Sequence, residues 1–451
     1  MMRFPKDFVW GAAAASYQIE GAYNTDDRGL SVWDAFSHRS GKTHNGHTGD
    51  VACDHYHRYK EDVALMRQIG LAAYRLSLSW SRILPHGVGR VNEQGLEFYD
   101  RLVDELLENH IEPYVTLFHW DFPLALYHRG GWLNRDSADW FADYAQVVMN
   151  VLGDRVRFWM TMNEPSVFTV LGHLSGIHAP GDQLSEADGF RIAHHVLMAH
   201  GKASLVIRAA RPDAQISMAG NGRIGIPQTE SEANITAARN FMFDTTHPEL
   251  WHLNWWTDPV MFGRYPQEGL KAVEAMMPED FERDLPTIHQ PYDFFGLNVY
   301  WGEYVSADAN SGFATVPKHM GSPITAFHWD ITPEVLYWGP RFLYERYQLP
   351  VLITENGLSN SDWVSLDGKV HDPQRIDYTA RHLLNFSRAH QDGVPIAGYL
   401  HWSILDNFEW GEGMKHRFGM IHVDYRTQKR TLKDSAYWYA DVIRSNGESL
   451  A

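Results

Sequence analysis

The stretch RFWMTMNEP, residues 157–165, is an apolar run that stops on a polar pair, Asn163 and Glu164. Its short length and bulky apolar residues are typical of a buried β-strand. A carboxylate at the end of such a strand is costly to remove from water unless it is paired or used in chemistry. The stretch therefore predicts a buried strand that ends on a functional carboxylate, whose partner must lie elsewhere in the chain.

Seven other short apolar runs resemble this one and alternate with longer amphipathic stretches. The eight runs in order are FVWGAAAAS (8–16), AAYRLSLSW (72–80), EPYVTLFHW (112–120), RFWMTMNE (157–164), QISMAGN (215–221), DFFGLNVY (293–300), PVLITEN (350–356) and PIAGYLHWS (395–403). The helix-like stretches between them are 54–70, 95–110, 137–152, 188–210, 333–347 and 374–390. Eight strands that alternate with helices predict an α/β fold, a (β/α)8 TIM barrel.

The rest of the chain agrees with one barrel domain spanning 1–451. No charge block, low-complexity segment or Pro/Ser-rich linker divides it. An open, doubly wound sheet is the alternative, but no G-x-G-x-x-G motif follows the first run. The segment 221–290 is too long for a simple crossover, so we expect extra helices or an excursion over the barrel mouth. Gly70 is expected to end the first helix, and Pro333, after Thr332, to open the fifth.

Polar and aromatic residues gather at the C-terminal ends of these runs. They are Gln18 and Glu20, Arg75 and Trp80, His119 and Trp120, Asn163 and Glu164, Asn221, Asn298 and Tyr300, Glu355 and Asn356, and His401 and Trp402. In a closed parallel barrel these ends meet at one rim, which is where barrel active sites lie. We therefore expect the active site at the C-terminal rim of the strands.

Composition narrows the class of partner. A net charge of −17 argues against nucleic acid and anionic membranes. The 17 Trp, 21 Tyr and 22 Phe include rings that could stack on sugars, although most should fill the core. Cys53 is the only cysteine, so no intramolecular disulfide is expected. The N-terminal stretch has no cleavable signal pattern and no apolar run could span a bilayer, so we expect a cytoplasmic protein.

Two of the strand ends carry carboxylates in similar surroundings, Glu164 in TMNEP and Glu355 in ITENG. They fall on the fourth and seventh runs, roughly across the barrel from each other. A facing pair of carboxylates without a metal cluster is typical of the active sites of glycoside hydrolases. A separation of about 5–5.5 Å permits a covalent intermediate and retention, whereas about 6.5–9.5 Å leaves room for water and gives inversion. The residues alone leave both outcomes open.

Taken together, these segments resemble glycoside hydrolase family 1, the β-glucosidase family of retaining (β/α)8 enzymes. The matching motifs are FVWGAAAASYQIEGA (8–22), YRLSLSWSRILP (74–85), TLFHWDFP (116–123), TMNEP (161–165), FFGLNVY (294–300), LITENG (352–357) and HWSILDNFEWGEGMKHRFGMIHVDY (401–425). The resemblance covers essentially the whole chain. It implies an exo-acting β-glycosidase, most simply a β-glucosidase that could also accept galactosides or fucosides.

Carried over by position, the resemblance implies that Glu164 is the general acid/base and Glu355 the nucleophile. Arg75 and Tyr300 would donate hydrogen bonds that keep Glu355 ionised, and Asn298 would support its surroundings. The charge on Glu355 would then raise the pKa of Glu164 toward the working range. Once a covalent glycosyl-enzyme forms, that charge disappears and Glu164 can act as a base.

The resemblance also implies a sugar pocket. Its glycone-binding residues would be Gln18, His119, Trp120, Asn163, Trp402, Glu409, Trp410 and Phe418. A charged Glu409 would suit a neutral sugar and repel a 6-phosphate, although Lys415 and His416 lie nearby in the chain. On the aglycone side, Trp329 would form an aromatic platform and Asn221 a hydrogen bond. Many family members carry Trp after the NEP motif, where Ser166 stands here, so the leaving-group subsite could be wider.

Four alternatives stay open at this stage. A metal-dependent barrel hydrolase would need ligands, but His55-x-His57 and His194-His195 lie in helix-like stretches away from strand ends, and we expect no metal or other cofactor. A non-catalytic sugar-binding relative would usually lack one glutamate. A 6-phospho-β-glycosidase or a transglycosidase would use the same catalytic pair. The expected partner is a small β-glycoside or short oligosaccharide, and the chain could form a homo-oligomer.

Overall fold

The computed structural model describes residues 4–450, and its centre is a closed barrel of eight parallel strands. The barrel strands are β1 (Val9–Ala13), β2 (Ala73–Ser77), β3 (Glu112–Phe118), β4 (Phe158–Asn163), β5 (Gln215–Gly220), β7 (Phe295–Asn298), β10 (Val351–Asn356) and β11 (Ile396–Trp402). Their order around the barrel follows the chain, and β11 pairs with β1 to close it. Every strand lies inside one of the eight predicted runs, so the (β/α)8 prediction is confirmed.

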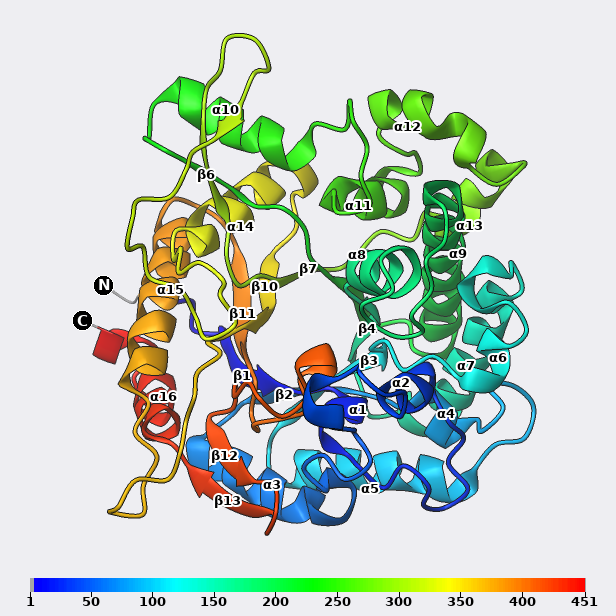
Figure 1. The fold of residues 1–451 in the computed structure, drawn as a ribbon, viewed down its shortest axis with the longest axis vertical. Coiled ribbons are helices and arrows are strands. Elements are labelled where there is room, and N and C mark those ends of the chain that lie inside the picture. The colour runs from blue at the N-terminus through cyan, green and yellow to red at the C-terminus, as the bar shows by residue number, and fades with distance from the viewer. Residues whose placement is uncertain (1–3, 451) are drawn as a thin grey trace.

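Helices surround the barrel on the outside (Figure 1). They are α1 (Ser16–Ile19), α2 (Val32–Ser37), α3 (His55–Ile69), α4 (Trp80–Ile83), α5 (Glu93–Glu108), α6 (Leu124–Tyr127), α7 (Ser137–Leu152), α8 (Pro165–Val167), α9 (Glu186–Ala210), α10 (Glu232–Phe243), α11 (Leu253–Phe262), α12 (Gln267–Val273), α13 (Leu285–Ile288), α14 (Val335–Tyr347), α15 (Pro373–Gln391) and α16 (Asp434–Arg444). The six predicted helices correspond to α3, α5, α7, α9, α14 and α15. Within residues 4–450, none of the helices is long and apolar enough to cross a membrane.

The predicted end of the first helix at Gly70 is confirmed, whereas the helix predicted to start at Pro333 starts two residues later. Gly70 follows α3 with a φ of +87° and its N–H bonds the carbonyls of the last turn, as expected of a C-terminal cap. Helix α14 begins at Val335 rather than at Pro333. The hydroxyl of Thr332 accepts the N–H of Gly302 at 2.9 Å, so this residue anchors a neighbouring loop rather than capping a helix that starts at Pro333.

The long segment between the fifth and sixth barrel strands carries the extra helices that its length predicted. Helices α10, α11, α12 and α13 lie here, and in Figure 1 α10, α11 and α12 lie along the top of the view, outside the barrel. A short strand in the same segment, β6 (Gly225–Pro227), pairs with β8 (Glu303–Ser306), which pairs with β9 (Ala314–Thr315). Near the C-terminus, β12 (Ile421–Asp424) and β13 (Lys429–Leu432) form an antiparallel pair. The β6–β8 pairing links the loops that follow the fifth and sixth barrel strands.

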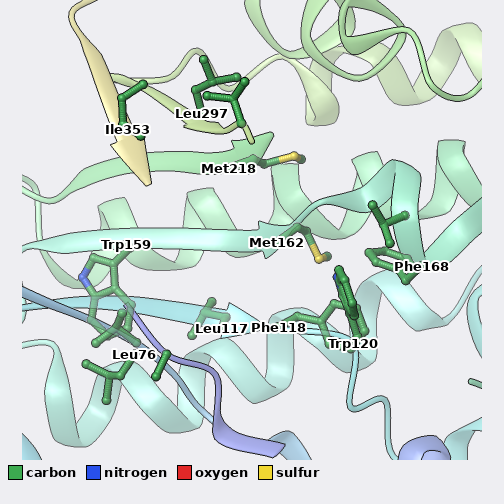
Figure 2. Packing of buried hydrophobic residues seen from close by; sticks show 14 of the residues in the cluster. Leu76, Leu117, Phe118, Trp120, Trp159, Met162, Phe168, Met218, Leu297 and Ile353 are labelled. Carbon is green, nitrogen blue, oxygen red and sulfur yellow. The ribbon is translucent and has the colours of Figure 1, made fainter. Parts of the chain in front are cut away.

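The barrel has two separate apolar layers, because neighbouring residues of a strand point to opposite faces. Met160 and Leu352 belong to the cluster that fills the barrel, whereas Trp159 and Ile353 belong to the layer between strands and helices. Figure 2 shows part of this outer layer, with Trp159 and Ile353 on their strands. The inner layer also contains Trp402 and Phe418, both predicted as pocket residues, so the core and the floor of the site are continuous.

A buried ionic cluster holds the two loops that follow β10 and β11. The ammonium of Lys433 lies 2.5 Å from a carboxylate oxygen of Asp362 and 2.7 Å from one of Asp406, and all three side chains are fully buried. Asp362 follows β10, whereas Asp406 lies three residues before Glu409 in the loop after β11. The cluster therefore ties the loop that carries Glu409 to the strand that carries Glu355.

Candidate active site

A cavity of about 760 Å³ opens at the C-terminal rim of the barrel, where the site was predicted. The predicted residues that line it are His119, Trp120, Glu164, Asn221, Asn298, Tyr300, Trp329, Glu355, Trp402, Glu409 and Trp410. The other four lie behind this lining. Arg75 and Asn163 hydrogen-bond to lining residues, Gln18 bonds Glu409, and the Phe418 ring lies 6.1 Å from that of Tyr300.

Both carboxylate oxygens of Glu355, near the end of β10, accept hydrogen bonds from predicted partners. Arg75 on β2 donates from Nη1 to Oε1 at 2.5 Å, and Tyr300 donates its hydroxyl to Oε2 at 2.8 Å. The guanidinium is fixed in turn, because its Nε donates to the hydroxyl of Thr116 at 3.0 Å. Burial raises the pKa of Glu355, while the charge of Arg75 and these hydrogen bonds oppose the rise. The surroundings thus favour an ionised Glu355 over its equally buried neighbour.

Glu164 follows β4, and no cation within residues 4–450 forms an ion pair with it. Its Oε1 accepts one hydrogen bond, from Asn298 Nδ2 at 2.9 Å. Burial and then the charge on Glu355 raise the pKa of Glu164 to about 8. Its backbone is in the left-handed region, at a φ of +43°, a conformation that is strained for a residue with a side chain and that clusters at functional sites. The structure therefore places a carboxyl that favours its protonated form beside one whose ionised form is stabilised by Arg75 and Tyr300.

Two asparagine side chains connect these carboxyls, and their orientation is set by neighbours. Thr354 donates its hydroxyl to Asn298 Oδ1 at 2.6 Å. The Asn298 amide nitrogen is thereby turned toward Glu164 and toward Asn163 Oδ1, which lies 2.9 Å away. Asn163 Oδ1 also accepts from Arg75 Nη2 at 2.6 Å. Sequence reasoning missed Thr354 and Thr116, although both belong to the quoted motifs, because a threonine in a strand gives no separate signal.

His119 and Trp120 are both engaged by Asn163. Because Asn163 Oδ1 already accepts two donors, its Nδ2 must donate to His119 Nε2, 3.0 Å away, which places the imidazole proton on Nδ1. Burial and then the charge of Arg75 hold the pKa of His119 well below its usual range, so the ring is neutral. The indole N–H of Trp120 donates to the Asn163 carbonyl at 2.9 Å. Trp120 therefore lines the cavity with its only donor already bonded inside the protein.

Gln18 and Glu409 lie together, and Glu409 lines the cavity with Trp402 and Trp410. Gln18 Nε2 approaches Glu409 at 3.4 Å, and Gln18 Oε1 is buried without a partner in the described chain. The Trp402 ring stacks on the His119 ring, with ring centroids 5.9 Å apart. Burial, followed by the charges of Glu355 and Glu164, raises the pKa of Glu409 to about 8.

This pKa bears on the expected exclusion of a 6-phosphate. That expectation assumed a full negative charge at Glu409, whereas burial and the neighbouring carboxylates favour its protonated form. The basic side chains nearby pair with a different carboxylate: Lys415 and His416 lie 3.0 and 3.5 Å from the carboxylate of Glu412.

Aromatic residues in the loops after the fifth and sixth barrel strands also line the cavity. Trp329 packs against Tyr300 with ring centroids 5.0 Å apart. Trp251 and Trp301 also line this region, and sequence reasoning missed them because they lie outside the strand-end pattern. Ser166 is fully buried and does not line the cavity, so its position cannot widen the subsite directly.

The histidines that suggested a metal have other partners. His55 lies 2.7 Å from Asp62, His194 contacts Tyr265 and Asp284, and His195 bonds the Trp132 carbonyl. Across residues 4–450, no group of three or more His, Cys, Asp and Glu side chains is arranged to hold a metal ion. The chemistry open to the site's own side chains is that of its carboxyls: one holds a proton, and the other is kept ionised.

Known proteins resemble this chain over its whole length. The family described as glycosyl hydrolase family 1 matches residues 1–448. A 1,4-beta-D-glucan glucohydrolase from Thermotoga neapolitana is 47% identical over 448 residues, which cover 99% of each chain. Beta-glucosidase A from Acetivibrio thermocellus is 46% identical over 453 residues, with 98% of this chain and 99% of the relative covered. A solved structure of the beta-glucosidase from Thermotoga maritima with deoxynojirimycin has a TM-score of 0.90 and 45% identity, covering 99% of this chain and 100% of that one.

Proposed function

The chain belongs to glycosyl hydrolase family 1, and from this premise we propose that it is a retaining, exo-acting β-glucosidase. Its substrates would be small β-glucosides and short oligosaccharides such as cellobiose. The observation that carries the proposal is the unequal environment of the two carboxyls. Glu355 accepts hydrogen bonds from Arg75 and Tyr300, whereas Glu164 has a pKa of about 8.

In the first step, Glu355 attacks the anomeric carbon while Glu164 gives its proton to the leaving-group oxygen, so the glycosidic bond breaks and a glycosyl ester forms. Esterification removes the charge of Glu355, and with it the repulsion that raised the pKa of Glu164. Glu164, now ionised, takes a proton from a water molecule that attacks the same carbon. The sugar leaves with retained configuration, Glu355 regains its charge and Glu164 its proton.

The remaining cavity residues divide between two subsites in this proposal. The nucleophile is supported by Arg75, Asn298 and Tyr300; the glycone is bound by Gln18, His119, Trp120, Asn163, Trp402, Glu409, Trp410 and Phe418; and the leaving group meets Trp329 and Asn221. Gln18 Oε1 supports this division, because it is a buried acceptor without a partner in the described chain beside Glu409. A protonated Glu409 can also donate, which suits a hydroxyl that both gives and accepts hydrogen bonds.

The proposal extends to one domain over the whole chain and to a cytoplasmic location. The family match over residues 1–448 and the β6–β8 pairing, which joins the excursion to the barrel, support the single domain. Cys53, the only cysteine, is buried and without a disulfide partner, which agrees with a reducing compartment.

Replacing Glu355 with glycine tests the mechanism. The variant should lose hydrolysis of 2,4-dinitrophenyl β-glucoside, and added azide should restore turnover with the α-glucosyl azide as product. Azide attack from the face that Glu355 occupied gives that anomer. Retained hydrolysis without azide, or a β-azide product, would refute the nucleophile assignment.

Replacing Glu164 with alanine tests the acid. The activity on phenyl β-glucoside, whose phenol is a poor leaving group, should fall far more than the activity on the dinitrophenyl compound, whose leaving group departs without protonation. Comparing kcat/KM for β-glucoside, galactoside, fucoside and 6-phospho-glucoside then tests the substrate, and a 6-phospho-glucoside preference would overturn it.

A further inference from the structure

Ser166 and Asn221 form a hydrogen bond that no sequence pattern suggested. Ser166 follows Pro165 in the loop after β4, and Asn221 follows β5, so the bond joins the loops of two neighbouring barrel strands. The Ser166 hydroxyl donates to Asn221 Oδ1 at 2.5 Å. Ser166 is fully buried and does not reach the cavity, whereas Asn221 lines it. Ser166 can therefore influence the cavity through Asn221.

In this structure the Ser166 hydroxyl, which can donate or accept, donates to the oxygen end of the Asn221 amide and leaves its nitrogen end free. Its Oδ1 is occupied by the Ser166 hydroxyl, while its Nδ2 has no protein partner among residues 4–450. The side chain therefore presents an N–H2 donor rather than a carbonyl acceptor at its free end.

The same arrangement occurs on the other side of the site. Thr354 donates to Asn298 Oδ1 at 2.6 Å, and the free amide nitrogen of Asn298 is thereby directed to Glu164. In both cases a buried hydroxyl from a neighbouring strand or loop holds an asparagine oxygen and leaves its nitrogen for the site. The Asn298 nitrogen meets protein groups, whereas the Asn221 nitrogen is left for a bound molecule.

The position of Asn221 indicates which part of a substrate it would meet. It follows β5, next to β4, whose end carries Glu164, the group that protonates the leaving-group oxygen in the proposed function. Trp402 and Glu409, assigned to the glycone, lie at the end of β11 and in the loop after it, and β11 is three strands away from β5 around the barrel. A donor beside Glu164 and remote from Glu409 faces the leaving group.

We propose that Ser166 is a positioning residue that holds Asn221 as a hydrogen-bond donor to the leaving group, and that this selects leaving groups bearing hydroxyl oxygens, such as a second sugar, over plain aryl groups. The inference rests on the proposed β-glucosidase activity and names the leaving-group class of that same site. An amide free to turn would offer its oxygen half of the time and would lose this preference.

The test compares kcat/KM for cellobiose and phenyl β-glucoside in the parent chain, Ser166→Ala, Asn221→Ala and the double variant. Both substrates need proton donation, but only cellobiose offers hydroxyls to the amide. One neutral hydrogen bond corresponds to roughly threefold to tenfold, so cellobiose should lose this factor in each single variant while phenyl β-glucoside changes by less than about twofold. The double variant should be no worse than Asn221→Ala, because Ser166 acts only through Asn221.

Two further variants keep the test decisive if Ser166→Ala folds poorly. Asn221→Asp keeps an oxygen for Ser166 but removes the N–H2 donor, and should lose cellobiose activity at least as strongly as Asn221→Ala. Thr169→Val is the matched control, since it removes a buried hydroxyl of the following turn that has no partner in the described chain. It should leave the ratio of the two substrates unchanged.

Each remaining outcome counts against a definite claim. Equal losses on cellobiose and phenyl β-glucoside would mean that Ser166 acts on Glu164, and additive losses in the double variant would mean that it acts independently of Asn221. Either result would overturn the inference and leave the β-glucosidase proposal intact. A parent chain that hydrolyses neither substrate would overturn both.

Discussion

Replacing Glu355 with glutamine should lower the pKa of Glu164, which is about 8 in the intact site. Burial and the charge on Glu355 both raise this pKa, and the substitution removes only the second cause. Glutamine has nearly the same shape, so Glu164 stays buried. The pKa should therefore fall toward, but not reach, the range of an exposed carboxyl.

The separation of the two carboxyls sets the size of the effect. Charge on Glu355 raises the pKa of Glu164, and the carboxyls of a retaining glycosidase lie about 5.5 Å apart. At an effective dielectric constant of about 20, two unit charges at that distance repel by roughly 3 kcal/mol. This corresponds to a displacement of the Glu164 titration midpoint by about two pH units. The charge of Arg75, no longer matched by Glu355, acts in the same direction.

The midpoint can be measured by NMR titration of protein labelled with 13C at the glutamate carboxyls, with Glu164→Gln used to assign the signal. Enzyme trapped with a 2-deoxy-2-fluoroglucosyl group on Glu355 should show the same lowering, because esterification also removes the charge. Glu409→Gln is the matched control, and it should move the Glu164 midpoint much less, since Glu409 is itself protonated below about pH 8. An unchanged or higher Glu164 midpoint in Glu355→Gln would refute charge repulsion as the cause.

The kcat/KM of the intact enzyme should fall as pH rises through about 8, because Glu164 must hold a proton to act as an acid; a basic limb that persists in Glu164→Gln would contradict this. Tyr300→Phe removes a donor that favours charged Glu355, so the pKa of Glu355 should rise and the acid limb of kcat/KM should move to higher pH; an unmoved limb would count against this role. Lys433→Met removes the ammonium shared by Asp362 and Asp406, which keep Arg375 and Arg417 as cations. The loss of two buried charged hydrogen bonds should lower the free energy of unfolding in urea by about 3 kcal/mol. The exposed Lys429→Met should change it by less than about 0.5 kcal/mol, and equal losses would show that the buried ionic cluster is not the reason.

The alternation of eight apolar runs with helix-like stretches was enough to predict the barrel, because few architectures bury strands and helices that alternate in this way. The same alternation placed Glu164 and Glu355 at one rim, since the ends of parallel strands converge there. Helix boundaries were less certain from sequence. Pro333 was expected to open α14, but the hydroxyl of Thr332 bonds Gly302, thirty residues earlier in the chain, and this contact has no local signature.

The amino-acid sequence by itself determined the fold, its rim and the pair of carboxyls, because these depend on patterns within each strand. The tertiary structure decided what each group can do. The Trp120 N–H bonds a carbonyl 43 positions away, Glu164 accepts from a residue 134 positions away, and the Ser166 bond to Asn221 spans 55. Proton occupancy at Glu164 and Glu409 likewise follows from burial and from charges on other strands. Such properties arise only when distant segments are brought together, so a pattern within one segment cannot contain them.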